Sequence, residues 1–203
     1  MEEGRFAGLY DASFGLLLRR IHRRIAKIAG RHGCRQVIDL GCGTGAQCIV
    51  LHNNKFDVTG VDMSPKMLEV ARKKSSPEID YIRGDIEKTG FEDGSFDCAI
   101  ISFVIHMNST ENERTILDEA KRIVREGGII VITDYGMPST FKGRVAELMV
   151  KIIENLAIEE HKKNYRRYME NGAMDFIIKE NDISVVERHG FYSGVIETIV
   201  AKK

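Results

Sequence analysis

The chain has no excess of either charge, because 30 Lys and Arg residues balance 30 Asp and Glu residues among 203. This balance does not favour a strongly basic nucleic-acid-binding protein, so we expect no nucleic-acid partner. No apolar run approaches the roughly 18 residues of a membrane-spanning helix, and the first residues lack the pattern of a signal peptide. We therefore expect a cytoplasmic protein with a single domain over residues 1–203.

The four cysteines form no recognisable metal-binding or disulfide pattern. Cys34, Cys42, Cys48 and Cys98 show no CxxC spacing and no accompanying pair of histidines, so we expect no metal site. Their spacing does not suggest a disulfide framework either, and reduced thiols are expected. Prolines are also scarce, and the three of them fall between predicted helices and strands.

The most informative run that is present is VIDLGCGTG, residues 37–45. Its apolar start and first glycine predict a buried strand that ends in a tight turn. Gly41, Gly43 and Gly45 lack a Cβ, can adopt positive φ and let a ligand approach the backbone closely. The helix predicted to follow would point its N-terminal N–H groups at this turn, as in nucleotide-binding α/β proteins.

The glycine pattern alone fits two kinds of cofactor. Gly41-x-Gly43-x-x-Ala46 satisfies the dinucleotide-binding fingerprint, so NAD is one candidate. Asp39 lies two residues before the first glycine, where its carboxylate would repel a pyrophosphate. It favours instead a ligand that carries an amino group or a sulfonium.

Predicted strands and helices alternate over the first two thirds of the chain. Strands are expected at 36–40, 56–61, 80–83, 96–103 and 129–133, and helices at 14–29, 45–53, 65–74 and 111–125. This alternation predicts an α/β fold, a Rossmann-like three-layer sandwich whose mainly parallel sheet is covered on both faces. Further helices are expected at 141–157, 160–169 and 182–189, before a last strand at 191–201.

Two more acidic residues follow predicted strand ends. Asp62 could accept hydrogen bonds from two ribose hydroxyls; its alternative role is to cap the next helix at Ser64. Asp85 could accept a hydrogen bond from an adenine amino group while the Ile86 N–H donates to a ring nitrogen; its alternative role is that of a turn residue.

Two neighbouring residues complete this predicted site. Met63 would provide a soft apolar surface beside an adenine ring. Ser102 ends the predicted strand nearest to the glycine loop.

Together these motifs resemble the class I S-adenosylmethionine-dependent methyltransferases. VIDLGCGTG resembles their first motif, VTGVDMSPKMLEVAR their second-strand motif and REGGIIVITDY their fifth-strand motif, while GDIEKTGFEDGSFDCAIISFVIHM resembles the region of strands three and four. The resemblance covers about residues 35–135 and implies S-adenosyl-L-methionine as cofactor.

The resemblance also implies a role for each residue by its position. Asp39 and the glycine loop would hold the methionine part of the cofactor, and Asp62 would hold the ribose. Asp85 and Ile86 would hold the adenine, and the Ser102 backbone would face the methionine amino group.

The flanking segments resemble a subgroup of this family. Residues 6–26, FAGLYDASFGLLLRRIHRRIA, resemble the start of ubiquinone/menaquinone-type methyltransferases and of bacterial phosphatidylethanolamine N-methyltransferases. In such enzymes a Tyr-Asp segment folds over the cofactor, and Tyr10 and Asp11 occupy that position here. Because only 13 residues follow Gly190, the C-terminal antiparallel strands are expected to be shortened.

The acceptor is expected to be a small molecule, such as a lipid headgroup or a quinone, but its reacting atom stays open. It would lie between an N-terminal helical cap (1–30), the cofactor-binding core (35–135) and a helical lid or substrate segment (136–175). Tyr10 and Tyr135 are candidate lining residues. His106 is the candidate general base, with a structural role as its alternative.

Two alternatives concern the whole chain and its first helix. The chain could be a non-catalytic regulatory or partner module that keeps the fold and the cofactor. Separately, the basic first helix could make peripheral contact with an anionic membrane, or it could present an ordinary solvated face. Its basic residues are Arg19, Arg20, Arg23 and Arg24.

Overall fold

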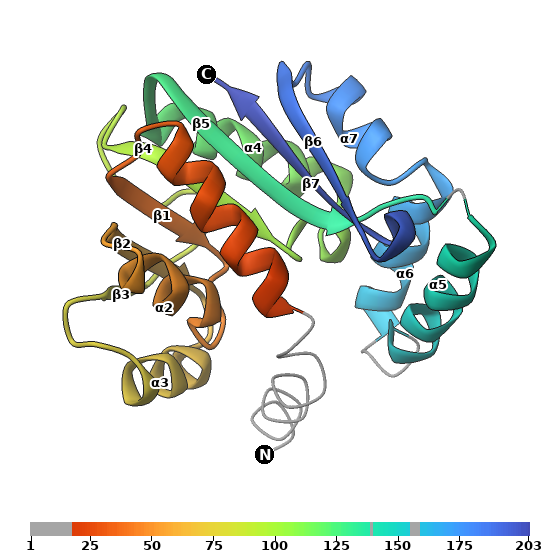
Figure 1. Cartoon of the computed structure of the whole chain (residues 1–203), viewed down its shortest axis with the longest axis horizontal. Helices are drawn as coiled ribbons and strands as arrows, with labels where there is room; N and C mark the ends of the chain where they lie inside the picture. Colours follow the sequence, from red (N-terminus) through yellow and green to blue (C-terminus); the bar gives the residue numbers. More distant parts are fainter. Residues whose placement is uncertain (1–17, 139, 155–158) are drawn as a thin grey trace.

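The computed structural model describes residues 18–138, 140–154 and 159–203, which form a seven-stranded sheet covered by helices (Figure 1). The strand order is β3-β2-β1-β4-β5-β7-β6. The strands are β1 (Gln36–Leu40), β2 (Asp57–Asp62), β3 (Asp80–Arg83), β4 (Phe96–Ser102), β5 (Val124–Tyr135), β6 (Val185–Phe191) and β7 (Ile196–Lys202). The first five strands pair in parallel, and β7 pairs antiparallel with both β5 and β6, which confirms the predicted Rossmann-like sandwich.

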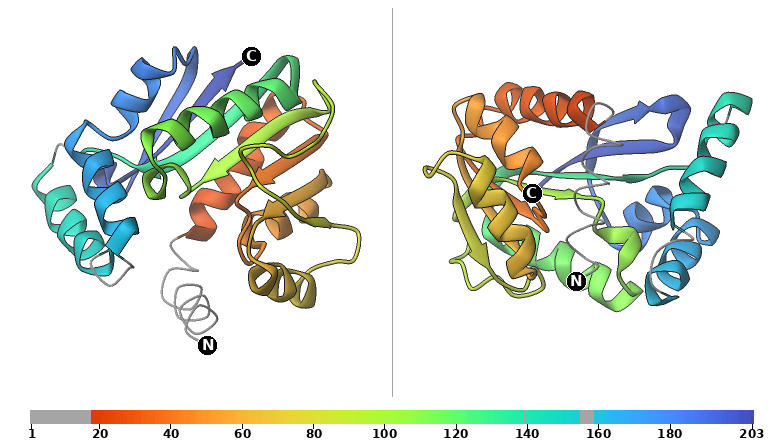
Figure 2. Two further views of the ribbon diagram at one scale, coloured as in Figure 1. Left: turned by 180° about the vertical axis from the view of Figure 1, so that it is seen from behind. Right: turned by 90° about the horizontal axis from the view of Figure 1, so that it is seen from below.

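The helices form two layers and one separate group. Residues 18–31 are helical, followed by α2 (Ala46–Asn53), α3 (Pro65–Lys74), α4 (Thr110–Ile123), α5 (Phe141–Glu154), α6 (Glu159–Glu170) and α7 (Met174–Glu180). Helix 18–31 and α2 cover one face of the sheet, and α4 and α7 cover the other, while α5 and α6 stand beyond the end of β5 (Figures 1 and 2). Within the described parts of the chain, every helix is too short or too polar to cross a bilayer.

Local sequence explains where these helices begin and pack. Ser64 accepts a hydrogen bond from the Met67 N–H at the start of α3, where Pro65 occupies the first turn. The apolar stripe of helix 18–31 is confirmed for Ile21, Ile25 and Ile28, which are all fully buried. Burial of this stripe fixes the helix against the sheet and leaves its basic residues outside.

The C-terminal strand pair corrects one prediction. A helix over residues 182–189 is wrong, because Val185–Phe191 is strand β6, which pairs with β7. In β6 the exposure of side chains alternates residue by residue, which is the period of a strand. The antiparallel strands are confirmed, and at seven residues each they are of ordinary length.

Candidate active site

The glycine loop leaves β1 and folds over the end of β2. The N–H groups of Gly41 and Cys42 both donate to the Val61 carbonyl oxygen, at 2.8 and 3.0 Å. Gly41, Gly43 and Gly45 have φ values of 77°, 51° and 76°. All three occupy the left-handed region that residues with a Cβ rarely adopt, as the sequence predicted.

The three glycines differ in what surrounds them. A Cβ on Gly41 would lie 2.5 Å from Cγ2 of Val104, and one on Gly45 would collide with the Tyr81 hydroxyl. A Cβ on Gly43 would meet nothing within 4 Å among the described residues. Packing therefore explains Gly41 and Gly45, whereas Gly43 borders open space at the start of α2.

Asp39 is a carboxylic acid in the interior of the protein. Asp39 is 2% exposed, and the Cys48 thiol donates a hydrogen bond to its Oδ2 at 3.3 Å. Burial, with a smaller contribution from the negative charge of Asp62, raises the pKa of Asp39 to about 7. A cation placed beside Asp39 would restore its ionised form.

Asp62 connects the glycine loop to the start of α3. Its Oδ2 accepts the Gly43 N–H and its Oδ1 accepts the Ser64 N–H, both at 2.8 Å. Ser64 rather than Asp62 caps the helix. Each carboxylate oxygen keeps a second lone pair for a further hydrogen bond.

The other predicted cofactor residues lie around the same edge of the sheet. Asp85 is exposed, and its Oδ1 accepts the Glu87 N–H at 2.9 Å, so it does form the turn that was its alternative role. Ile86 is half-buried, whereas Met63 is 63% exposed despite its apolar side chain. The Ser102 hydroxyl is buried without a hydrogen-bond partner among the described residues.

Strand pairing brings these positions together. In the order β3-β2-β1-β4, the four carboxyl ends lead to Asp85, Asp62, Gly41 and Ser102. This edge, where strand order reverses on either side of β1, is where open α/β sheets bind ligands. Tyr10 lies outside the described residues.

A second group of polar side chains centres on His106. His106 follows β4, lies in the short helix η1 (Ile105–Met107) and is buried. Its Nδ1 lies 2.7 Å from Oδ1 of Asp134, and its backbone N–H donates to Oδ2 of the same carboxylate at 3.2 Å. Asp134 therefore holds both the position and the orientation of the imidazole ring.

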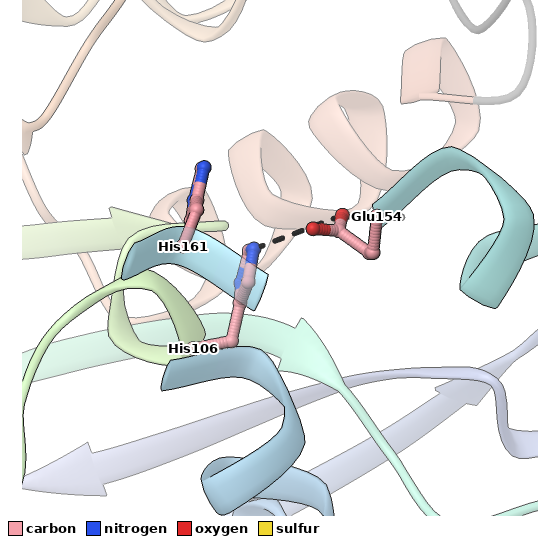
Figure 3. A group of neighbouring side chains, drawn as sticks. All are labelled: His106, Glu154 and His161. Carbon is pink, nitrogen blue, oxygen red and sulfur yellow. Dashed lines mark ion pairs between the residues drawn. The ribbon is translucent and has the colours of Figure 1, made fainter. Parts of the chain in front are cut away.

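Helices α5 and α6 bring further side chains to His106. The Tyr135 hydroxyl donates to Oε1 of Glu154 at 2.8 Å, and Nε2 of His106 lies 4.0 Å from the same oxygen (Figure 3). The Tyr165 hydroxyl and Nε2 of His161 are buried without a hydrogen-bond partner in the described structure. We call His106, Asp134, Tyr135, Glu154, His161 and Tyr165 the histidine–tyrosine cluster.

The pKa values of the two histidines in this cluster are shifted in opposite directions. Burial lowers the pKa of His106, but the Asp134 carboxylate outweighs it and the pKa is raised overall. Burial and the neighbouring His106 lower the pKa of His161. His106 is thus the stronger proton acceptor of the two.

Three members of the cluster carry atoms that bind metals. Ligand atoms of His106, Glu154 and His161 lie within 4.8 Å of one another. The two imidazole rings, however, are stacked with 4° between their planes and 5.9 Å between their centroids. Lone pairs in the planes of stacked rings do not converge on one point, so this arrangement favours hydrogen bonding over metal coordination.

A cavity of about 430 Å³ opens beside the cluster. Its lining residues are Met137, Glu147, Glu154, Lys162, Tyr165, Arg166, Met169 and Glu170. The predicted substrate residue Tyr135 is buried behind Glu154, to which its hydroxyl donates. Glu154 and His161 were not predicted from the sequence, because only the packing of α5 and α6 brings them to His106. Asp134, near the end of β5, was also missed, and the pairing of β5 with β4 brings it to His106.

Comparison with known proteins is consistent with this architecture. Residues 38–132 match a family model described as a methyltransferase domain. The demethylmenaquinone methyltransferase of Thermotoga maritima is 26% identical over 198 residues, which cover 92% of this chain and 85% of that protein. The malonyl-[acyl-carrier protein] O-methyltransferase of Serratia marcescens is 33% identical over 129 residues, covering 64% of this chain.

The chain spans about half the length of the Serratia protein, 49%. Among solved structures, the N-methyltransferase NodS of Bradyrhizobium japonicum, in complex with S-adenosyl-L-homocysteine, has the same fold with a TM-score of 0.65. It is 15% identical, with 91% of this chain and 86% of that one covered. Residues 38–132 therefore form a methyltransferase domain, and the relatives and the sheet order agree with the class I S-adenosylmethionine-dependent methyltransferases.

Proposed function

We propose that this protein transfers a methyl group from S-adenosylmethionine to a small-molecule acceptor. The observation that carries the proposal is the grouping of carboxylates with an open glycine loop at the ends of neighbouring strands. Relatives named for acting on demethylmenaquinone and on malonyl-[acyl-carrier protein] support a catalytic role. They do not favour the alternative of a non-catalytic module.

Each part of the cofactor has residues that suit it chemically. Asp39 and the glycine loop would hold the methionine part, since a buried carboxylate with a raised pKa gains from a neighbouring ammonium. Asp62 would accept the ribose hydroxyls with its remaining lone pairs while it keeps Gly43 and Ser64 in place.

The adenine would lie farther along the same edge. Asp85 would accept from its amino group, and the Ile86 N–H would donate to a ring nitrogen. The exposed Met63 side chain would cover the ring. The Ser102 backbone would face the methionine amino group, and the buried Ser102 hydroxyl, which has no partner among the described residues, supports a ligand on this side of the loop.

When bound, the cofactor supplies an electrophilic methyl carbon on a sulfonium. The protein then has to orient the acceptor and exclude water. For an acceptor that loses a proton, His106 would receive it at Nε2, because Asp134 occupies Nδ1. Asp134 thereby acts as a positioning residue.

Incubation with labelled S-adenosylmethionine and cell extract tests this function. After separation into lipid, small-molecule, protein and RNA fractions, we expect label in the small-molecule or lipid fraction. Label in no fraction, together with normal binding of S-adenosylhomocysteine, would support the non-catalytic alternative. Label confined to RNA or protein would contradict the proposed acceptor class.

We further propose peripheral contact with anionic lipid and a cytoplasmic location. Arg19, Arg20, Arg23, Arg24 and Lys27 are all exposed along helix 18–31. Residues 18–38 include no acidic residue, so the helix itself contributes only positive charge to this face. All four cysteines are free, which supports a reducing compartment.

A further inference from the structure

The buried part of the histidine–tyrosine cluster has more negative than positive side chains. Arg167 pairs with Glu113, and its Nη1 lies 3.3 Å from Oε2 of that carboxylate. His106, even when protonated, is paired closely with Asp134 and lies 4.0 Å from Glu154. Glu154 therefore shares its ion-pair partner, His106, with the closer Asp134 carboxylate.

The cations that line the cavity do not neutralise Glu154. Lys162 pairs with Glu159 at 3.3 Å, and Arg166 is exposed. Glu147 and Glu170 also line the cavity. A buried carboxylate that shares its cation with a second carboxylate is only partly compensated, and a ligand cation would lower the remaining cost.

Polar atoms without partners point to the same place. Tyr165 is 7% exposed and lines the cavity. Neither its hydroxyl nor Nε2 of His161 has a hydrogen-bond partner among the residues that the structure describes. Burial, and then the charges of Glu154, Glu147 and Asp134, raise the pKa of the Tyr165 hydroxyl, so the potential at this hydroxyl is negative.

Aromatic rings complete the surroundings of Glu154. Tyr135 and Tyr165 pack edge to face at 5.4 Å, and the His106 ring lies 4.8 Å from Tyr135. Faces of tyrosine rings attract ammonium groups, and the attraction is strongest where water is excluded. Carboxylate, tyrosine and thioether side chains in one cavity are a suitable environment for an organic cation.

We infer that the methyl acceptor carries a basic amine, and that Glu154 recognises its ammonium form beside Tyr165. This inference rests on the proposed function and names the acceptor class of the same site. Glu154 would select the cation against an acceptor of similar shape with a hydroxyl or a carboxylate. An anionic group at this position would be repelled by Glu154 and Glu147.

The reaction requires the amine in its free form. The ammonium loses one proton to Nε2 of neutral His106 or to solvent through the cavity, which leaves a lone pair on nitrogen. That lone pair forms the N–C bond as the S–C bond breaks, and the sulfur keeps the bonding pair. The methylated ammonium then releases a second proton, so the ammonium and S-adenosylmethionine together yield the methylamine, S-adenosylhomocysteine and two protons.

Binding of three matched probes tests the inference. Tyramine, tyrosol and 4-hydroxyphenylacetate share a phenol ring and chain length but are cationic, neutral and anionic. With the protein saturated by S-adenosylhomocysteine, calorimetry should give tyramine at least about tenfold tighter binding than tyrosol, and no binding of the anion. Equal binding of tyrosol, preference for the anion, or no binding of any probe would overturn the inference.

Variants assign the preference to Glu154. Glu154→Gln keeps an acceptor for the Tyr135 hydroxyl and should abolish the advantage of tyramine over tyrosol. Glu170→Gln, an exposed residue of the same cavity, should keep it. Both should bind S-adenosylhomocysteine like the parent, and neither should melt at a lower temperature than the parent. Tyramine preference intact in Glu154→Gln would refute the assignment.

Failure of the inference is distinct from failure of the proposed function. If S-adenosylhomocysteine does not bind the parent protein, the proposed function itself is wrong. If it binds and the charge preference is absent, only the amine class is excluded.

Discussion

At the scale of single residues, the three glycines of the loop are needed for different reasons, two for packing and one, under the proposed function, for a ligand. Gly41 and Gly45 are required because Val104 and Tyr81 occupy the space of a Cβ. Gly43 has no such neighbour, and its N–H is held by Asp62. Among the described residues, none fills the space beside Gly43, which is therefore open to a ligand.

Replacement of Gly43 by alanine should separate cofactor binding from stability. We expect Gly43→Ala to lose about 1 kcal/mol of stability from its positive φ, and to bind S-adenosylhomocysteine at least about tenfold more weakly. Gly33, with a φ of 68° and no neighbour within 4 Å of a Cβ, is the matched control. Gly33→Ala should show the same stability loss with unchanged binding, and equal affinities in calorimetry would contradict this account.

Asp39 should make stability depend on pH. Its pKa of about 7 in the folded protein exceeds its usual value, so the folded protein keeps a proton that the unfolded chain releases between about pH 4 and 7. Stability from protonated Asp39 is full below pH 4 and is lost as the pH rises through 7.

Comparison with Asp39→Asn isolates this effect. The unfolding free energy of the parent minus that of the variant should fall by up to about 4 kcal/mol from pH 4 to 7, then level off. Urea titrations at several pH values measure it. A difference that stays flat or rises with pH would show that Asp39 ionises freely.

At the scale of elements, α4 anchors the segment between β3 and β4. Glu119 accepts hydrogen bonds from the Thr89 N–H at 2.8 Å and from Arg122, whose Nε lies 2.8 Å away. These contacts, led by Arg122, lower the pKa of Glu119 to about 2. The segment that carries Asp85 is thus fixed to the helix.

Glu119→Gln should lower the unfolding free energy by about 1–2 kcal/mol at neutral pH. Because the folded pKa is depressed, the stabilisation is present above pH 4.5 and is lost as the pH falls toward 2. Asp118→Asn, on the same helix but 60% exposed, should change stability little. Equal effects of the two substitutions in urea titrations would argue against the anchoring role.

Helix 18–31 should bind anionic vesicles through its outer face. The parent should sediment with phosphatidylglycerol vesicles at low salt and release at high salt, since exposed charges are screened. The triple variant Arg19→Glu, Arg20→Glu and Arg23→Glu should lose this binding. A control with the same charge change at exposed Lys55, Lys88 and Lys179 should keep most of it, and equal losses would contradict a specific face.

At the scale of the whole molecule, the sheet places the proposed cofactor site next to the histidine–tyrosine cluster, because the two follow adjacent strands. The glycine loop follows β1, and His106 follows the adjacent β4. Helices α5 and α6, which carry Glu154 and His161, lie beyond the end of β5 (Figure 1). Under the proposed function, one protein thus combines a cofactor site at the sheet edge with a separately built acceptor cavity.

The sequence allowed prediction of the first part because its signals are local. The run from Val37 to Gly45 encodes strand, turn and positive φ within nine residues, and strand pairing then aligned Asp62 and Asp85. Residues 182–189 were wrongly predicted as a helix. They include part of β6, whose many polar residues form a strand only because β7 pairs with them. Glu154 and His161 could not be predicted, since no local pattern states how α5 and α6 pack on His106.

Calorimetric titration with S-adenosylhomocysteine tests the central claim most directly. The parent should bind at micromolar concentration, and Asp62→Asn should weaken binding by about tenfold or more through loss of a charged acceptor. Asp57→Asn, an exposed position at the start of the same strand, should bind like the parent. No heat with the parent, or unchanged affinity in Asp62→Asn, would contradict the account.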